Sequence, residues 1–324
     1  MRVSVIVAAY NAAQYLNVAV DSISAQTERD LEVLVVDDAS TDATAEIVAA
    51  RAARDPRIRL VRAPVNAGPG AARNLGLAAA RGDWIAILDA DDRFHPQRLE
   101  RLLDLAGRHG SDIVADNQRL CPNGRPDGTV MFSSTWLPAE TLLDPTAFLA
   151  GNTSRQGRGR RGFGYLKPLI RRGFLQETGL RYDDDRFAED FMFSLRCLLR
   201  GARWVLTPEA LYDYTVRDGS GTTTHSAGDL ARLIARERAL LDAASGAEQA
   251  ALRRALRRHL RTVELALAWF RFAEALKRQG PAAAAVQMVR DPGTITHILG
   301  EGLRAAPRVL ARVAPNRAKD APNR

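Results

Sequence analysis

The sequence contains little cysteine and no long apolar run. Its two cysteines, Cys121 and Cys197, lie far apart and show no C-x-x-C spacing. This scarcity argues against a disulfide framework and a structural zinc site, and it is typical of proteins from a reducing compartment. No uncharged apolar stretch approaches the roughly 20 residues of a membrane-spanning helix, and residues 1–9 are too short for a signal peptide and resemble a first strand. We therefore expect a cytoplasmic protein.

Lysine is also scarce, because it supplies only 3 of the 46 basic residues. The formal net charge of +8 is unevenly distributed: residues 228–324 carry 18 Arg/Lys against 9 Asp/Glu, whereas the first 227 residues carry 28 against 29. A basic C-terminal region indicates an anionic partner there. Its arginines are not interleaved with aromatic residues as in a nucleic-acid recognition motif, so we expect no nucleic-acid partner.

The first half of the chain alternates apolar runs with amphipathic segments. The runs, which we predict to be strands, are 3–9, 31–36, 58–61, 84–88 and, more weakly, 112–115. Helical spacing of apolar residues predicts helices over 12–25, 41–54, 70–80 and 96–108. This alternation predicts an α/β fold with a mostly parallel, Rossmann-like sheet flanked by helices. In such sheets ligands bind at the carboxyl ends of the strands.

The second half is less regular. Between residues 121 and 164 the pattern is weak, and beyond it the predicted helices are 171–178 and 190–200 and the predicted strands 203–206 and 211–216. Helices over 228–244 and 247–278 follow, and the longer one carries an apolar stripe with arginines on its other faces. We expect the last 25 or so residues to fray.

Three carboxylates, Asp89, Asp91 and Asp92, follow the apolar run that ends at Leu88. Clustered like charges at a strand end repel one another and resist desolvation, so folding does not require them. Hard divalent cations such as Mg²⁺ or Mn²⁺ prefer carboxylate and phosphate oxygens, which favours a metal site. The plainer interpretation is an acidic loop that precedes the next helix.

Two further pairs of carboxylates lie where ligands bind. Asp37 and Asp38 follow the second run, where they either shape the turn and help to cap the next helix or accept a hydrogen bond from a ligand N–H group such as that of uracil. Glu189 and Asp190 begin a helix, where they either stabilise its dipole or supply a general base for an incoming hydroxyl. Neighbouring phenylalanines would partly exclude water from this base.

A glycine-rich segment, 66–74, resembles a phosphate loop because its glycines precede a helix. The G-x-G-x-x-G spacing fails at Arg73, and the glycines follow the third strand instead of the first. A dinucleotide fold of the nicotinamide type is therefore excluded. Arg73 itself is placed to contact a diphosphate or to hold an aspartate.

In their joint order these motifs resemble the family 2 glycosyltransferases, inverting enzymes with the GT-A fold. The resemblance covers roughly residues 1–215, and the matching segments are Val3–Asn11, Val35–Asp42, Asn66–Gly68, Ala71–Gly76, Leu88–Asp92 and Glu189–Asp190. It implies that a nucleotide-diphospho-sugar and a divalent metal ion, Mg²⁺ or Mn²⁺, bind at the ends of the first strands.

The resemblance also implies roles for individual residues. Those expected to bind the nucleotide-sugar are Ala8, Ala9, Tyr10, Asp38, Arg73, Asp89 and Arg217. Asp91, with Asp89 and His225, would bind the metal that bridges the two phosphates. Asp190 would be the catalytic base, with Glu189 beside it.

Two regions keep two interpretations each. The composition of 218–225 predicts a mobile loop, in which His225 is either solvated or part of a lid over the donor diphosphate. Family members often carry a similar segment, which here is Tyr212-x-Tyr214-x-x-Arg217-x-x-Ser220. The C-terminal arginines depart from the family pattern and form either a solvated face or a surface attracted to an anionic membrane or a lipid-diphosphate acceptor.

We predict an inverting, metal-dependent glycosyltransferase that moves a hexose from a UDP-sugar to a hydroxyl of a saccharide or lipid-linked acceptor. Its setting would be exopolysaccharide or cell-surface glycan biosynthesis, at the inner face of the cell membrane. The catalytic domain would span 1–226, with the nucleotide-sugar side over 1–117 and the acceptor side over 118–226, and 227–324 would be a basic helical extension. The alternatives are a sugar nucleotidyltransferase, whose glycine-rich loop after the first strand is missing here, and a non-catalytic sugar-nucleotide or membrane-binding module.

Overall fold

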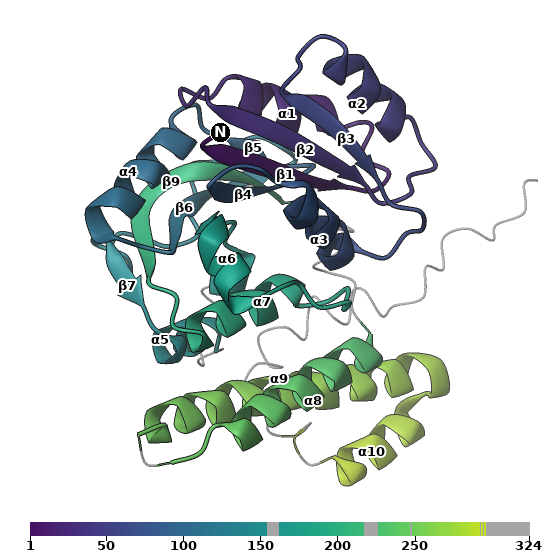
Figure 1. Cartoon of the computed structure of the whole chain (residues 1–324). Coiled ribbons are helices and arrows are strands. Elements are labelled where there is room, and N and C mark those ends of the chain that lie inside the picture. The colour runs from purple at the N-terminus through teal and green to yellow at the C-terminus, as the bar shows by residue number, and fades with distance from the viewer. Residues whose placement is uncertain (154–161, 217–225, 247, 292, 294, 296–324) are drawn as a thin grey trace, which may run out of the picture. The chain divides into compact units, whose positions relative to one another are not determined.

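The computed structural model describes residues 1–153, 162–216, 226–246, 248–291, 293 and 295. The chain divides into two compact units, one made of residues 1–152 and 161–224 and the other of residues 153–160 and 225–324. The first unit contains the sheet, and the second contains the basic helices (Figure 1). The functional domain boundary at residue 226 stays a prediction.

A nine-stranded sheet forms the centre of the first unit. Its strands are β1 (Val3–Ala9), β2 (Leu31–Asp37), β3 (Ile58–Arg62), β4 (Trp84–Asp89), β5 (Arg93–Phe94), β6 (Ile113–Pro122), β7 (Thr141–Leu143), β8 (Leu169–Arg171) and β9 (Trp204–Val216). Their order is β3-β2-β1-β4-β8-β6-β9-β5, and β7 pairs with β9. The strands β1 to β4 are parallel, whereas β8 runs antiparallel to both of its neighbours, β4 and β6. The predicted α/β fold with a mostly parallel first half is confirmed.

Helices cover both faces of the parallel part. The described helices of the first unit are α1 (Leu16–Ser24), α2 (Thr44–Ala52), α3 (Pro69–Ala79), α4 (Arg98–His109), α5 (Pro145–Asn152), α6 (Arg172–Thr178) and α7 (Glu189–Leu199), with a 3₁₀ turn η1 (Phe163–Tyr165). Val3, Val5 and Val7 of β1 share one apolar core with α1 and α4. Ile6 points to the opposite face, toward α3. Because successive side chains of a strand alternate, burial of both sets requires a helix layer on each side.

Helix α3 approaches β1 closely because residue 76 is glycine. A Cβ atom at Gly76 would lie 2.5 Å from Cγ2 of Ile6, a separation that packed atoms do not tolerate. The glycine in the Ala71–Gly76 motif therefore serves helix–strand packing. The same contact fixes Arg73, one turn earlier on α3, relative to the end of the sheet.

The later part of this unit differs from the sequence prediction. β9 is one strand of 13 residues, whereas the sequence predicts two short strands, because it continues to pair with β6 through a register shift at Asn117. β5 and β8, with two and three residues, are too short for a periodic pattern and form because neighbouring strands supply their hydrogen bonds. The weakly patterned stretch 121–164 contains β7, α5 and η1.

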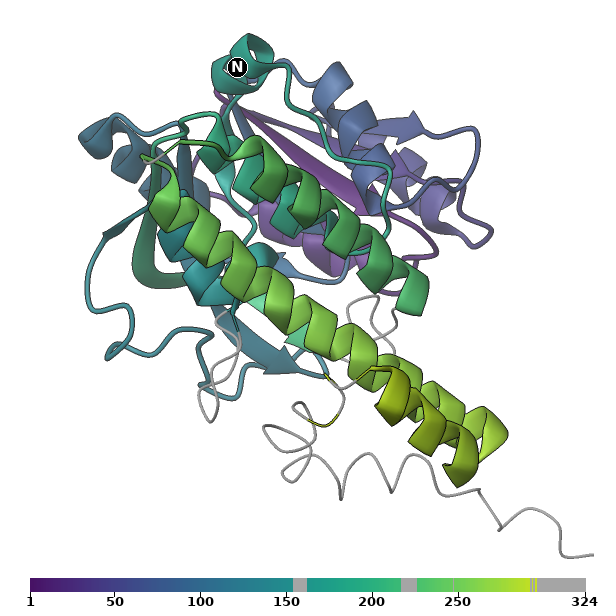
Figure 2. The same ribbon diagram turned by 90° about the horizontal axis from the view of Figure 1, so that it is seen from below.

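The second unit consists, in its described part, of α8 (Ala227–Ala243), α9 (Ala250–Gln279) and α10 (Pro281–Arg290), the last of which the sequence does not predict. Ser226 and Asp229 form a reciprocal capping box at the start of α8. Helices α8 and α9 lie side by side in Figures 1 and 2, with a buried contact of 2.9 Å between Glu237 Oε1 and His259 Nδ1. Among the described residues, none of the helices is both long enough and apolar enough to cross a bilayer.

Candidate active site

The carboxyl ends of β1, β2 and β4 meet at one edge of the sheet. Ala8 of β1 is paired with Asp89 of β4, and Ala9 is paired with Asp37 of β2. Tyr10 follows β1 directly and exposes 51% of its surface. The structure thus brings together motifs from the first 90 residues that the family resemblance assigns to the nucleotide-sugar.

The loops that follow β1 and β2 are hydrogen-bonded to each other. The Asn11 N–H donates to Ser40 Oγ at 3.0 Å, and the Thr41 N–H donates to Asn11 Oδ1 at 2.9 Å. Helix α2 begins at Thr44, and its N-cap residue Ala43 makes no side-chain cap. The Thr44 N–H donates to Asp42 Oδ1 at 3.0 Å, and the Ser40 N–H donates to Asp37 Oδ1 at 3.0 Å. Asp37 therefore shapes the turn after β2, and Asp42 binds the first N–H of the helix.

Asp38 holds the segment that leads into α3. Its Oδ1 accepts from the Ala67 N–H at 3.0 Å and its Oδ2 from the Gly68 N–H at 2.8 Å. Gly68 has φ of +94°, in the region that favours glycine, which explains the glycine at this point of the sequence. Asp38 is only 3% exposed, so a ligand N–H would have to use the remaining lone pairs of an already occupied carboxylate.

Arg73 joins the end of β4 to the start of α7, over more than a hundred residues of sequence. Its Nη2 lies 2.9 Å from Asp89 Oδ1. Its Nη1 lies 3.0 Å from Glu189 Oε1 and 2.9 Å from Asp190 Oδ1. The side chain is 3% exposed, so these ion pairs are largely shielded from solvent. Of the two interpretations offered for Arg73, the structure supports its holding an aspartate.

Lys167, which belongs to none of the sequence motifs, completes this arrangement. Its Nζ lies 2.9 Å from Asp89 Oδ2 and 2.6 Å from Asp190 Oδ2, and the side chain is 5% exposed. Each of the two aspartates therefore binds Arg73 through one oxygen and Lys167 through the other. We call the closed circuit of Arg73, Lys167, Asp89 and Asp190 the charged ring.

The charged ring perturbs the ionisation of its members. Burial alone would raise the pKa of Asp89, but the charges of Lys167 and Arg73 outweigh it and hold that pKa well below its usual range. Burial would lower the pKa of Lys167, but Asp190 and Asp89 raise it above its usual value. For Glu189, burial raises the pKa and the charge of Asp190 adds to the effect. Asp89 is thus a fixed anion, whereas Glu189 gains proton affinity.

Tyr182 and Asn74 tie α3 to the segment before α7. The Asn74 side chain donates to the Tyr182 carbonyl and accepts from the Tyr182 N–H, both at 2.9 Å. The Tyr182 ring stacks on Phe193, with centroids 4.0 Å apart, and lies 5.3 Å from the Arg73 guanidinium carbon. One of the neighbouring phenylalanines, Phe193, thus packs on Tyr182, which lies beside the arginine that pairs with both acidic residues.

A second group of carboxylates follows β4. Asp92 is buried, and its oxygens accept from the Tyr212 hydroxyl at 2.6 Å and from the Thr215 N–H at 2.7 Å. Burial raises the pKa of Asp92 well above its usual range, and the nearby charges of Asp89 and Asp91 add to this rise. The Thr215 hydroxyl donates to the Asp91 carbonyl at 2.6 Å. We call Asp91 and Asp92 the acid turn, which is thus fastened to the end of β9.

The carboxylates at the end of β4 differ in their fitness for a metal ion. Both oxygens of Asp89 and both of Asp92 are engaged by protein donors. Asp91, which the family resemblance assigns to the metal, is half-buried and lies between them in sequence. Within the described ranges no group of three or more His, Cys, Asp or Glu side chains could hold a metal by itself. Mg²⁺ in nucleotide sites is held by one or two carboxylates plus phosphates, and Asp91 fits that requirement.

Comparison with known proteins decides the family. The family model described as Glycosyl transferase family 2 matches residues 4–149. The succinoglycan biosynthesis proteins ExoO and ExoU of Rhizobium meliloti (strain 1021) are each 37% identical to the chain, over 91% of it and 83% of ExoO, and over 92% of it and 86% of ExoU. The chain belongs to glycosyl transferase family 2. It is therefore a glycosyltransferase, and neither a sugar nucleotidyltransferase nor a non-catalytic module is supported.

Solved structures agree with this glycosyltransferase in fold. S. aureus TarS 1-349 in complex with UDP-GlcNAc matches with a TM-score of 0.64 and 19% identity, over 93% of this chain and 81% of TarS. The mannosyltransferase PcManGT from Pyrobaculum calidifontis, in complex with GDP-Man and Mn²⁺, matches with a TM-score of 0.55 and 22% identity, over 96% and 84%. The GT-A fold that the family resemblance implies is thereby confirmed.

The candidate site residues of this family 2 enzyme fall into three groups: predicted and brought together, predicted but outside the described residues, and not predicted. Those brought together at the sheet edge and the start of α7 are Ala8, Ala9, Tyr10, Asp38, Arg73, Asp89, Asp91, Glu189 and Asp190. Arg217 and His225 lie outside the described residues. Lys167, Tyr212 and Thr215 are the additions, and only Tyr212 lies in a motif that the resemblance names.

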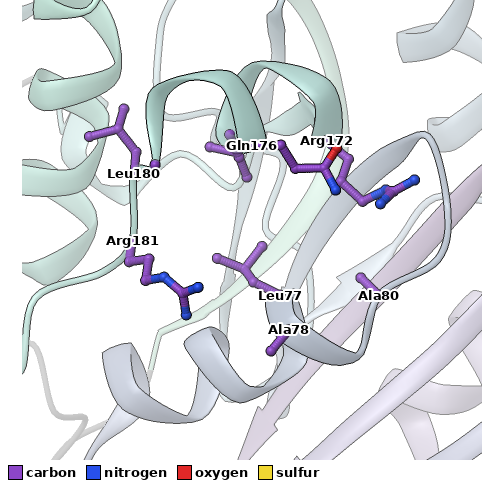
Figure 3. A pocket seen from close by; sticks show the side chains of 9 residues that line it. Leu77, Ala78, Ala80, Arg172, Gln176, Leu180 and Arg181 are labelled. Carbon is purple, nitrogen blue, oxygen red and sulfur yellow. The ribbon is translucent and has the colours of Figure 1, made fainter.

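A separate groove of about 390 Å³ lies beside α3 and α6 (Figure 3). Its lining includes Leu77, Leu175 and Leu180 together with Arg172 and Arg181. In Figure 3 the Leu77 and Arg181 side chains point toward each other across the groove. None of the predicted site residues lines it, so the groove is distinct from the sheet edge where the carboxylates gather.

Proposed function

We propose that this family 2 enzyme is an inverting, divalent-metal-dependent hexosyltransferase that uses a UDP-sugar. The proposal rests chiefly on one observation. The charged ring joins Asp89, at the end of the strands that carry the donor motifs, to Asp190, at the start of α7, through two buried cations. An enzyme that must align a donor with a base requires such a juxtaposition.

The donor would lie across the ends of β1, β2 and β4. Ala8, Ala9 and Tyr10 would contact the base, with Asp38 accepting from a ring N–H, and Asp89 would face the ribose or the sugar. The exposed ring of Tyr10 supports this assignment, because a flat aromatic side chain at a strand end offers a surface on which a base stacks. The TarS complex with UDP-GlcNAc is a structural neighbour that supports a uridine nucleotide.

A divalent cation would be held by Asp91 and the two phosphates, with Asp89 and His225 as the other predicted ligands. When bound, a cation of this kind neutralises the negative charge that develops on the departing nucleoside diphosphate. The PcManGT complex with Mn²⁺ supports the choice of metal. The protein contributes the position of Asp91, whose carbonyl is fastened by Thr215. Arg217, which lies outside the described residues, would contact the diphosphate.

Asp190 would act as general base, with Glu189 beside it. It would take the proton of the acceptor hydroxyl while that oxygen attacks the anomeric carbon from the face opposite the diphosphate. The new glycosidic C–O bond forms as the bond to the diphosphate breaks, so the configuration inverts without a covalent enzyme intermediate. Asp190 is 16% exposed at its side chain, which leaves access for an acceptor beside its two ion pairs.

The names of ExoO and ExoU support a setting in exopolysaccharide assembly, with a saccharide or lipid-linked acceptor. The second unit supports a position at an anionic membrane surface. Arg254, Arg257, Arg258 and Arg261 are exposed on α9, and their spacing of three and four residues places them on one helix face. Such a basic face would attract the inner leaflet or a lipid diphosphate.

The decisive experiment is to screen UDP-hexoses for UDP release, with and without Mn²⁺, in the presence and absence of saccharide acceptors. We expect release from at least one donor, dependent on the metal and lowered about 1,000-fold in Asp190→Asn. A nuclear magnetic resonance assay of the product would then give the anomeric configuration. Retention of configuration, or release of pyrophosphate in place of UDP, would contradict the proposal.

A further inference from the structure

Lys167 has a position that the proposed reaction leaves unexplained. It lies between η1 and β8, in a segment that no family motif covers, yet its Nζ reaches both Asp89 and Asp190. Only 3 of the 46 basic residues in this chain are lysines, so lysine here departs from the chain's general use of arginine. An ammonium group is a compact point charge that fits between two carboxylates, whereas a guanidinium is a wider planar fork.

A buried scaffold fixes the backbone of Lys167. Arg98, which is fully buried, donates through Nη2 to the Lys167 carbonyl and to Asp116 Oδ1. Its guanidinium carbon lies 4.3 Å from the Phe94 ring centroid and 5.1 Å from that of Tyr212. Tyr212 in turn donates to Asp92 of the acid turn. One guanidinium therefore supports both the lysine segment and the turn that would hold the metal.

Stability alone is a weak reason for this arrangement. Removing two charges from water costs free energy that their attraction only partly offsets, so a buried ion pair is seldom retained for its contribution to folding. The geometry offers a better reason. Asp89 and Asp190 come from elements a hundred residues apart, and two cations that each touch both aspartates set the separation of the two carboxylates.

We propose that Lys167 is a positioning residue for the base. Its ammonium holds Asp190 Oδ2 at a fixed place relative to Asp89, so that the group that takes the acceptor proton stays aligned with the donor. Lys167 acts through Asp190 and does not itself contact the reacting atoms. This inference rests on the proposed role of Asp190 as base.

The test compares Lys167→Met and Lys167→Arg with the wild-type chain, using UDP-hexose turnover with Mn²⁺ and calorimetric binding of UDP. A misplacement of about 1 Å in a reacting group costs on the order of 100-fold in rate, so we expect Lys167→Met to lower kcat by about that factor. The KM for the donor and the affinity for UDP should change far less than kcat, because Arg73 still holds Asp89. Lys167→Arg, which keeps the charge, should restore part of the lost kcat.

Arg59→Met is the matched control. Arg59 Nη1 pairs with the buried Glu32 at 2.9 Å, so this change also removes the cation from a buried carboxylate in the same unit, away from the charged ring. It should lower the melting temperature without lowering kcat. If Lys167→Met kept kcat near wild type, or lost UDP affinity and kcat together with no recovery in Lys167→Arg, the positioning role would be wrong.

A double-mutant cycle measured by thermal unfolding tests the contact between Lys167 and Asp190 without any measurement of turnover. The melting temperature of Lys167→Met/Asp190→Asn should fall by less than the sum of the two single changes, because each removes the partner of the other. Additive losses would contradict the contact. Failure of the proposed function would give a different result: the wild type would release no UDP, or Asp190→Asn would keep its turnover.

Discussion

The two proposed sides of the predicted catalytic domain, residues 1–226, are built on different principles. On the donor side, residues 1–117, parallel strands present short motifs at their ends, and neighbouring loops hold those motifs through local hydrogen bonds. On the acceptor side, residues 118–226, the described strands include short antiparallel pieces, and the functional groups come from a turn, a helix start and a strand end. The groups proposed to bind the donor are thus placed by short motifs at strand ends, whereas the proposed base is placed by tertiary contacts.

The charged ring is where the two sides meet. Asp89 and Arg73 belong to the donor side, and Lys167 and Asp190 belong to the acceptor side. Each cation binds one aspartate from each side, so neither side completes the ring alone. Changes at this junction should therefore have the largest effects, and changes within one side should have smaller or more local ones.

The largest expected effect is on the acceptor side. Asp190→Asn keeps the shape of the side chain but removes the proton acceptor, and should lower kcat by about 1,000-fold, within the range of general-base catalysis. UDP binding, which belongs to the donor side, should persist. Steady-state turnover and calorimetry on the same preparation measure the two quantities. Loss of UDP binding together with turnover would mean that Asp190 also supports donor binding, which would contradict the division into two sides.

The next effect concerns the donor side. Asp91→Asn should lower metal-dependent turnover by about 100-fold, as expected when charge stabilisation of a leaving group is weakened. The apparent affinity for Mn²⁺ should fall with it, as measured by a metal titration of UDP release. Asp92→Asn is the comparison, because the Asp92 oxygens are occupied by Tyr212 and Thr215. An equal loss of metal affinity in both variants would contradict the special role of Asp91.

A third prediction tests packing on the donor side alone. Gly76→Ala should cost about 1–3 kcal/mol of unfolding free energy, because the new methyl group overlaps Ile6. Gly107→Ala is the control, since a Cβ atom there has no neighbour within 4 Å and an alanine in α4 should stabilise by about 0.5–1 kcal/mol. Denaturant unfolding measures both. Equal and small effects would mean that α3 has room to move away from β1.

The smallest effect concerns an ion pair between the two sides. Hydrogen bonds from Arg108 and His109 at the end of α4 lower the pKa of Glu140 to about 2. Because this folded pKa lies below the ordinary value, the contribution to stability is present above the ordinary pKa and is lost as pH falls toward 2. Glu140→Gln should therefore flatten the acid side of a melting-temperature profile slightly, since exposed pairs contribute little. A change near neutral pH larger than that at acid pH would contradict this assignment.

Most of the structure of the donor side could be predicted from the sequence. The parallel strands, the helices between them and the ends where Asp38, Asp89 and Asp91 lie follow from apolar periodicity and from the order of the motifs. The hydrogen bond that the Gly68 N–H donates to Asp38 explains why two separate motifs occur together. Local pattern suffices there because each motif directly follows the element that positions it.

The acceptor side was less predictable for a physical reason. β8 has three residues and forms only because β4 and β6 flank it, and β9 continues through a register shift that breaks the pattern. Lys167 reaches the site through the tertiary path of the chain, which no motif or spacing near residue 167 predicts. One signal was available: in a chain with 43 arginines, a lysine flanked by apolar residues between two short elements is unusual.

The carboxamide at position 74 has a consequence for the whole enzyme. The Asn74 side chain donates one hydrogen bond to the main chain of Tyr182 and accepts one from it, as a neighbouring strand would. This single residue therefore links α3 to the segment before α7. An aspartate at this position could accept a hydrogen bond but not donate one, so the link would lose one of its two hydrogen bonds. The alignment of two substrates would then depend on a side chain that touches neither of them.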